Sequence, residues 1–204
     1  MLRGKVYKVV SVWRYGWSES FSTVLPSTVY KYAVATFCKY PHKRLIIHFI
    51  QPHYPYLTLK FQDKSLEQLR KIVLKGYRNV YRMFHISKSC GNFLKKLVAI
   101  YGTPIYIDLD TQFHIKGYKQ NLSLVMNYVE KLIKVFPGKI VITADHGEAF
   151  GEKIHPMLPF RVYGHIPGIR IPALIYVPWL EIYGKGSIEK AKKELVKLKV
   201  PKIR

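Results

Sequence analysis

The fold that this sequence predicts depends most on the stretch Lys139-Ile140-Val141-Ile142-Thr143-Ala144-Asp145-His146-Gly147-Glu148. Residues 139–143 are mainly β-branched and apolar, which is typical of a buried strand. Asp145 and His146 come directly after this strand, and an open α/β sheet presents its functional side chains at the carboxyl ends of strands. A carboxylate and an imidazole so close together can both reach one divalent ion if the backbone turns sharply, and Gly147 lowers the steric cost of that turn. The competing interpretation is a strand-to-loop turn in which Asp145 caps a helix and His146 has no role.

Strand and helix patterns alternate along the rest of the chain. The predicted buried strands, recognised by short runs of β-branched and aromatic residues, are 6–13, 44–50, 139–143 and 171–177. The predicted helices, recognised by apolar residues at helical spacing between prolines and glycines, are 26–39, two or three segments in 65–101, and 118–136. This alternation predicts a single α/β domain over residues 1–204, in three α/β/α layers with a mainly parallel sheet, and a basic helix or tail at 185–204.

The charge of the chain is strongly positive. Lysine and arginine number 34 against 12 acidic residues, which gives a formal net charge of +22. Such a charge predicts attraction to polyanions, a class that includes nucleic acid, anionic lipid headgroups, and sulfated or phosphorylated substrates. Because the lysines are spread through the predicted helices rather than gathered in one block, the competing interpretation is an ordinary solvated surface.

The number of cysteines and the length of the apolar runs indicate where in the cell the protein is expected. Only Cys38 and Cys90 are present, too far apart for a C-x-x-C motif, so we expect buried thiols in a reducing compartment, with Cys38 in the core. No run reaches the roughly 18 to 20 apolar residues of a membrane span. The sequence therefore predicts a cytoplasmic protein that touches, at most, an anionic membrane surface.

Three segments, in the same order, resemble the alkaline-phosphatase/sulfatase superfamily. Ile142-Thr143-Ala144-Asp145-His146-Gly147-Glu148, followed by Gly151-Glu152, is similar to the D-H-G-E segment of that family. Tyr163-Gly164-His165, followed by Ile169-Arg170-Ile171-Pro172, is similar to the stretch downstream of it. His48-Phe49-Ile50-Gln51-Pro52-His53-Tyr54-Pro55-Tyr56 resembles the family's strand end that faces the ester group. In detail the chain resembles the C-terminal portion of small archaeal sulfatase-like proteins.

The resemblance implies a metal-dependent hydrolase or transferase that acts on a sulfate or phosphate ester. It assigns a divalent metal ion, zinc, manganese or calcium, to Asp145, His146 and His165. It places the substrate's anionic group near His53 and His48, of which His53, in the loop at the strand's end, is the better contact, and His48, inside the predicted strand, is explained more simply as a core histidine. Lys153 is a further substrate candidate because an ammonium group neutralises an anionic oxygen. An intact site of this family uses the cation as a Lewis acid while an activated hydroxyl attacks phosphorus or sulfur.

The family's nucleophile has no counterpart in this sequence. In the family a Ser, Thr or formylglycine-forming Cys, with another metal-binding Asp, precedes the matching segments, and no C/S-x-P-x-R signature occurs here. We therefore expect the sheet to lack the family's N-terminal strands and the chain alone to be inactive. Three explanations stay open: an incomplete reading frame or split gene, a partner chain that supplies the N-terminal part, and a degenerate relative that binds without catalysis.

Two other classes of function compete with this one. A basic nucleic-acid-binding protein is favoured by the charge and by aromatic residues that alternate with basic ones, as in Tyr77-Arg78-Asn79-Val80-Tyr81-Arg82. Buried aromatic residues produce the same pattern. A non-catalytic interaction subunit is the third reading, and co-purification with a chain that carries the nucleophile would favour it.

Overall fold

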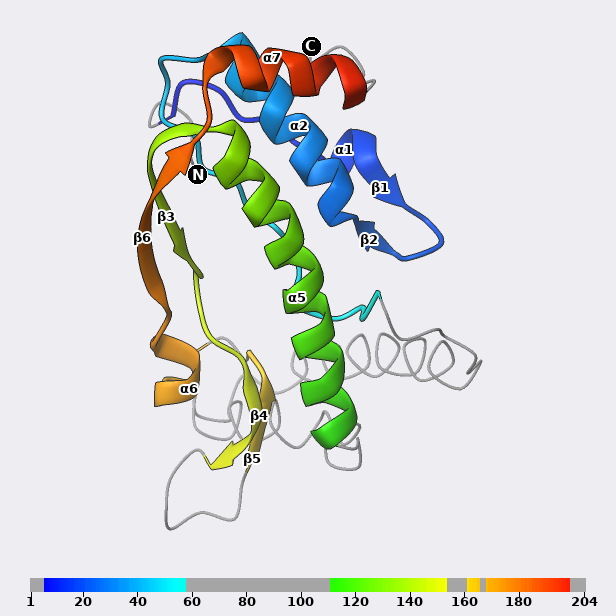
Figure 1. Ribbon diagram of the computed structural model, residues 1–204. Helices are drawn as coiled ribbons and strands as arrows, with labels where there is room; N and C mark the ends of the chain where they lie inside the picture. The colour runs from blue at the N-terminus through cyan, green and yellow to red at the C-terminus, as the bar shows by residue number, and fades with distance from the viewer. Residues whose placement is uncertain (1–5, 58–110, 154–160, 166–167, 199–204) are drawn as a thin grey trace, which may run out of the picture. The chain divides into compact units, whose positions relative to one another are not determined.

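A computed structural model describes residues 6–57, 111–153, 161–165 and 168–198 of the chain (Figure 1). The chain divides into two compact units. The first unit comprises Met1–Thr58, Gly117–Thr143 and Pro178–Arg204, and the second comprises Leu59–Lys116 and Ala144–Val177. The helices predicted in 65–101 lie outside the described residues.

Helix α2 (Pro26–Lys39) is the most buried element of the first unit. It begins at Pro26, which suits this place because its fixed φ is helical and its missing N–H has no partner in a first turn. Val34 is fully buried, and Tyr30 and Phe37 are nearly so. The helix predicted at 26–39 is confirmed.

The core of the first unit is built where α2 meets the end of α5 (Thr111–Val135) and α7 (Ile188–Leu198). Its buried members are Tyr30, Ala33, Val34, Phe37, Leu132, Val135, Phe136 and Ala191. The rings of Phe37 and Phe136 lie 4.6 Å apart between centroids. Cys38 packs partly against this core, and burial raises the pKa of its thiol, as expected for a structural cysteine.

Helix α5 begins at Thr111, seven residues before the predicted start at Tyr118. Gly117 explains the difference, because glycine weakens a helix pattern read from sequence. In the structure a Cβ at Gly117 would lie 2.3 Å from Cδ2 of Tyr56, so the glycine makes room for a buried ring. One turn further, the side chain of Asn121 is fully buried.

All strand pairs among the described residues are antiparallel and two-stranded. They are β1 (Trp17–Ser18) with β2 (Thr23–Val24), β3 (Pro137–Thr143) with β6 (Trp179–Lys185), and β4 (Ala149–Lys153) with β5 (Arg161–Gly164). The molecule therefore contains both helices and strands, as predicted, but the mainly parallel three-layer sheet is not seen in the described part. The strand predicted at 139–143 is confirmed as β3, but its residues are exposed or half-buried, so the prediction that it is buried is wrong.

Three predicted strands are wrong. Residues 44–50 pair with no described strand, although Leu45, Ile47 and Phe49 pack partly against the core of the first unit. Residues 6–13 are largely exposed and lead into the helical turn α1 (Trp13–Gly16). Residues 171–177 contain the helical turn α6 (Pro172–Ile175), because Pro172 occupies the first helical position and the Ile171 carbonyl accepts the turn's first hydrogen bond from Leu174.

The described part of the second unit is organised around the β4–β5 hairpin. Ala149 and Val162 from the two strands pack with Ile171 and Leu174 into a small core. The pairing shifts register between Phe150 and Glu152, where Gly151 takes a φ of 108°. This bulge interrupts the ladder, which continues with Glu152 opposite Val162.

Candidate metal centre

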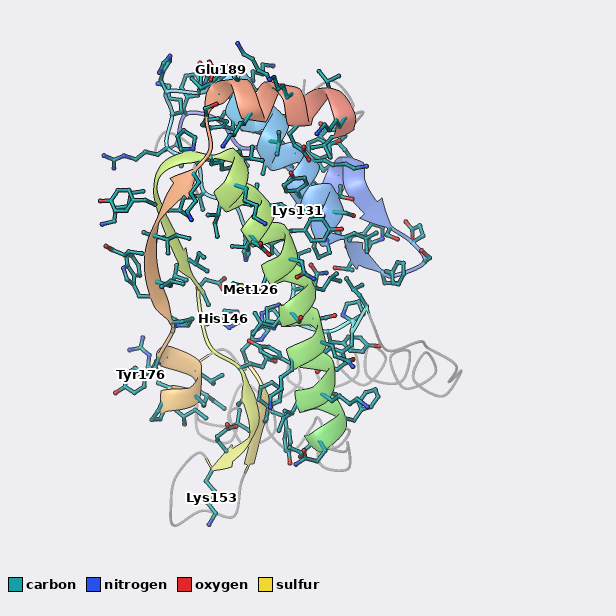
Figure 2. The ribbon with its side chains drawn as sticks, viewed as in Figure 1. Met126, Lys131, His146, Lys153, Tyr176 and Glu189 are labelled. Atoms are coloured by element: carbon teal, nitrogen blue, oxygen red, sulfur yellow. The ribbon has the colours of Figure 1, made fainter. Side chains whose placement is uncertain are left out.

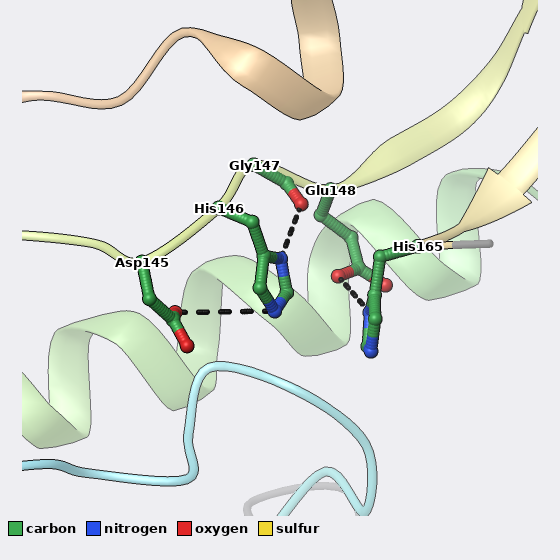
Figure 3. A network of polar contacts seen from close by, with 5 residues as sticks. All are labelled: Asp145, His146, Gly147, Glu148 and His165. Carbon is green, nitrogen blue, oxygen red and sulfur yellow. Dashed lines mark hydrogen bonds and ion pairs between the residues drawn. The ribbon is translucent and has the colours of Figure 1, made fainter. Parts of the chain in front are cut away.

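The turn that precedes β4 is held against α6 by Gly147. The Gly147 N–H donates a hydrogen bond to the Leu174 carbonyl at 2.9 Å. A Cβ at this position would lie 1.9 Å from the Ala173 carbonyl oxygen, so only glycine fits. The backbone therefore turns here, and the side chains on either side of Gly147, those of His146 and Glu148, both reach the same place (Figure 3).

The ring of His146 is oriented by a backbone carbonyl. Its Nδ1 lies 2.8 Å from the Gly147 oxygen, and because a carbonyl only accepts, Nδ1 carries the proton and donates. The lone pair is then on Nε2, which lies 3.9 Å from Oδ1 of Asp145. A backbone acceptor on the far nitrogen is the usual arrangement for a metal-ligating histidine.

Glu148, directly before β4, and His165, directly after β5, approach each other at the same end of the hairpin. Oε2 of Glu148 lies 3.2 Å from Nδ1 of His165. The Glu148 side chain is only 14% exposed, whereas that of His165 is 50% exposed. The His165 ring also faces the His146 ring, with 4.3 Å between centroids and 36° between planes.

One ligand atom from each of His146, Glu148 and His165 lies within 4.8 Å of the other two. In a tetrahedral zinc site with bonds near 2.1 Å, neighbouring ligand atoms are about 3.3 Å apart, close to the spacing between Glu148 and His165. Two imidazoles and one carboxylate form a donor set that holds a divalent ion and leaves positions open on its outer side. These residues therefore fit a metal ion.

The structure brings together His146 and His165, two of the three ligands predicted from the sequence. Asp145, the third, is 65% exposed at its side chain and is not among the grouped ligand atoms. Glu148 joins the group instead. Its position in the D-H-G-E motif was a signal, but only the turn at Gly147 shows that residues two apart in sequence point to one place.

Of the predicted substrate contacts, Lys153 belongs to the second unit, and His48 and His53 belong to the first. Lys153 is exposed at the end of β4, and Figure 2 shows it well away from His146. His48 is exposed in the first unit. His53 lies in the loop 51–57 of the same unit, where its carbonyl accepts a hydrogen bond from Nδ2 of Asn121 at 3.0 Å.

No family model matches the sequence, and no curated protein or solved structure matches it either. The superfamily resemblance consequently rests on the motif residues alone.

Proposed function

We propose that His146, Glu148 and His165 hold a divalent metal ion, and that the protein is a metal-dependent hydrolase or transferase of sulfate or phosphate esters. The observation that carries the proposal is the grouping of the three ligand atoms within 4.8 Å. The ester chemistry is supported by the motif order in the sequence and by the excess of basic residues, which favours anionic substrates.

Each residue has a defined part in this proposal. The bound ion supplies Lewis-acid stabilisation of an anionic oxygen. His146 binds through Nε2 while the Gly147 carbonyl fixes its ring. Glu148, the least exposed of the three, supplies the negative charge, and His165 closes the group from β5. Asp145, whose Oδ1 lies 3.9 Å from Nε2 of His146, adds negative charge beside the ion.

The donor set favours some metals over others. Two nitrogen ligands suit zinc and manganese, whereas calcium in proteins takes oxygen ligands almost exclusively. Among the three metals that the resemblance implies, we therefore propose zinc or manganese. A partner chain that supplies the nucleophile remains part of the proposal.

The test is calorimetric titration of zinc, manganese and calcium into the intact chain and its variants. Glu148→Gln keeps the shape but removes the charge, and it should weaken zinc binding at least tenfold, as should His165→Ala. His42→Ala removes an exposed histidine of the first unit and should change nothing. Equal binding by the wild type, Glu148→Gln and His165→Ala would refute the metal site.

A second measurement addresses the ester. Inorganic phosphate and sulfate are titrated into the zinc-loaded and the metal-free protein. We expect the anion to bind more tightly to the loaded wild type than to loaded Glu148→Gln. If the anion binds equally well with and without the metal, the metal site still stands, but the proposal that it acts on sulfate or phosphate esters is contradicted.

A further inference from the structure

Exposed apolar side chains concentrate in two segments of the described chain. Of the nineteen exposed large hydrophobic side chains among the described residues, six fall within residues 175–183, around Trp179, and seven within residues 6–21. The seven are Val6, Tyr7, Val9, Trp13, Tyr15, Trp17 and Phe21. Four are aromatic residues between positions 13 and 21, the segment that forms α1, β1 and the turn before β2. Such a concentration marks an interaction surface rather than scattered surface residues.

One side of this segment is fixed by contacts with buried residues. Trp17 pairs with Val24 across the β1–β2 ladder. Thr23 and Val24 are almost completely buried, and the amide of Gln51 donates hydrogen bonds to Thr23 Oγ1 and to the Val24 carbonyl. The exposed aromatic side chains are therefore presented by an element whose other face belongs to the packed interior.

The surface also carries a hollow. Trp13, Arg14, Trp17 and Glu19 line a shallow depression of about 640 Å³. Its lining is mainly apolar, and its two tryptophans are 58% and 45% exposed. Because both line the same depression, they lie on one side of the segment.

A cation lies directly beside one of these aromatic rings. Cζ of Arg14 lies 5.1 Å from the centre of the Trp13 ring. Tryptophan and tyrosine are the residues enriched at the membrane–water interface, and arginine and lysine beside them attract anionic headgroups. The chain as a whole adds a net charge of +22 of the complementary sign.

We propose that residues 13–21 form a surface that binds anionic phospholipid membranes. Trp13, Trp17 and Phe21 enter the interface, while Arg14 contacts lipid phosphates. Among the described helices none is long and apolar enough to cross a membrane, so the contact is peripheral. Single-stranded nucleic acid would use aromatic stacking in a positively charged groove, whereas Arg14 and Glu19 leave residues 13–21 without net charge, so the exposed tryptophans favour lipid. This inference is independent of the metal centre.

The test exploits the three tryptophans of the chain. Trp179 lies in β6 and is 67% exposed, so it matches Trp13 and Trp17 in type and exposure but lies outside the segment. In a Trp179→Phe background, fluorescence reports only Trp13 and Trp17. With phosphatidylcholine vesicles that contain phosphatidylglycerol, we expect a blue shift and quenching by bromine-labelled acyl chains. Pure phosphatidylcholine vesicles should give much weaker binding.

Vesicle sedimentation of the full-length variants completes the test. Trp13→Ala/Trp17→Ala should weaken binding at least tenfold, Arg14→Gln about fivefold, and Trp179→Ala not at all. Circular dichroism checks that the variants fold. Two results would overturn the proposal. No quenching by the labelled chains would indicate adsorption by net charge alone, and a loss of binding in Trp179→Ala as large as in Trp13→Ala/Trp17→Ala would show that residues 13–21 are not the specific contact. Protection of Trp13 and Trp17 by single-stranded RNA but not by vesicles would assign the surface to nucleic acid instead.

Discussion

A single buried amide fixes the loop that carries His53. Oδ1 of Asn121 accepts from the Leu57 N–H at 2.8 Å, and Nδ2 donates to the carbonyls of Pro52, His53 and Pro55 at 3.0 to 3.3 Å. Asn121→Ala leaves these buried groups without their partner, so the free energy of unfolding should fall by about 3 kcal/mol. Denaturant unfolding measures the change. Asn127→Ala on the exposed side of the same helix is the control and should cost less than about 1 kcal/mol.

The contact between α2 and α7 through Tyr30 has a pH dependence. The Tyr30 hydroxyl donates to Oε1 of Glu194 at 2.9 Å. Burial, and then the hydrogen bond and the charge of Glu194, raise the pKa of Tyr30 well above its usual range. A raised folded pKa means that the stabilisation is complete below the unfolded value, near pH 10, and is lost as the pH rises from there through the folded pKa.

Tyr30→Phe should therefore cost about 1 kcal/mol at neutral pH, where the hydrogen bond is intact. Above about pH 10 the difference between wild type and variant should shrink, because the unfolded wild type gains stability by ionising. Urea unfolding at a series of pH values measures this. A difference that stays constant or grows up to about pH 11 would contradict the assignment.

At the scale of the element, α5 contains a glycine whose replacement should have the opposite of its usual effect. Alanine in place of glycine within a helix normally stabilises by about 1 kcal/mol. In α5 the new methyl group of Gly117→Ala would overlap the Tyr56 ring, which is 4% exposed and closely packed. We expect a loss of about 1 to 3 kcal/mol in thermal or urea unfolding. Ser123→Ala, exposed on the same helix, should show the ordinary small gain.

The elements also show how far the sequence could predict the fold. α2 and β3 were predictable because their signals are local: a proline at the first helical position, and a β-branched run before a glycine turn. Residues 44–50 have the composition of a strand, but a strand also requires a neighbour, which composition does not reveal. At 171–177 the apolar run predicted a strand, but Pro172 starts a helical turn there instead.

The site was predictable to a similar extent. His146 and His165 were found from motif order, and the structure groups them. Glu148 was missed as a ligand because spacing alone does not show that the close approach of Gly147 to α6 bends the chain between residues 146 and 148. The positions of His53 and Lys153 depend on tertiary structure, which no local pattern specifies.

At the scale of the whole molecule, ester hydrolysis requires a hydroxyl group that can act as the nucleophile near the metal centre. The described part of the second unit contains one aliphatic hydroxyl, that of Thr111, and it donates to the Tyr163 hydroxyl at 3.4 Å. The sequence has no C/S-x-P-x-R signature of the family's nucleophile, so we expect the zinc-loaded chain alone to hydrolyse 4-nitrophenyl phosphate and sulfate no faster than a Glu148→Gln control. Robust turnover that Glu148→Gln abolishes would show that this chain carries the nucleophile itself.

The two-stranded sheets have a consequence for the behaviour of the protein in solution. In the described part of the chain every strand is an edge strand, including β3 with its Ile140-Val141-Ile142 run. Open edges invite pairing between molecules, and mutual repulsion from a net charge of +22 opposes it. Because added salt shortens the range of that repulsion to about 3 Å at 1 M, colloidal stability should fall as ionic strength rises. Light scattering should therefore show self-association that increases with salt, the reverse of the salt dependence expected for binding to a polyanion.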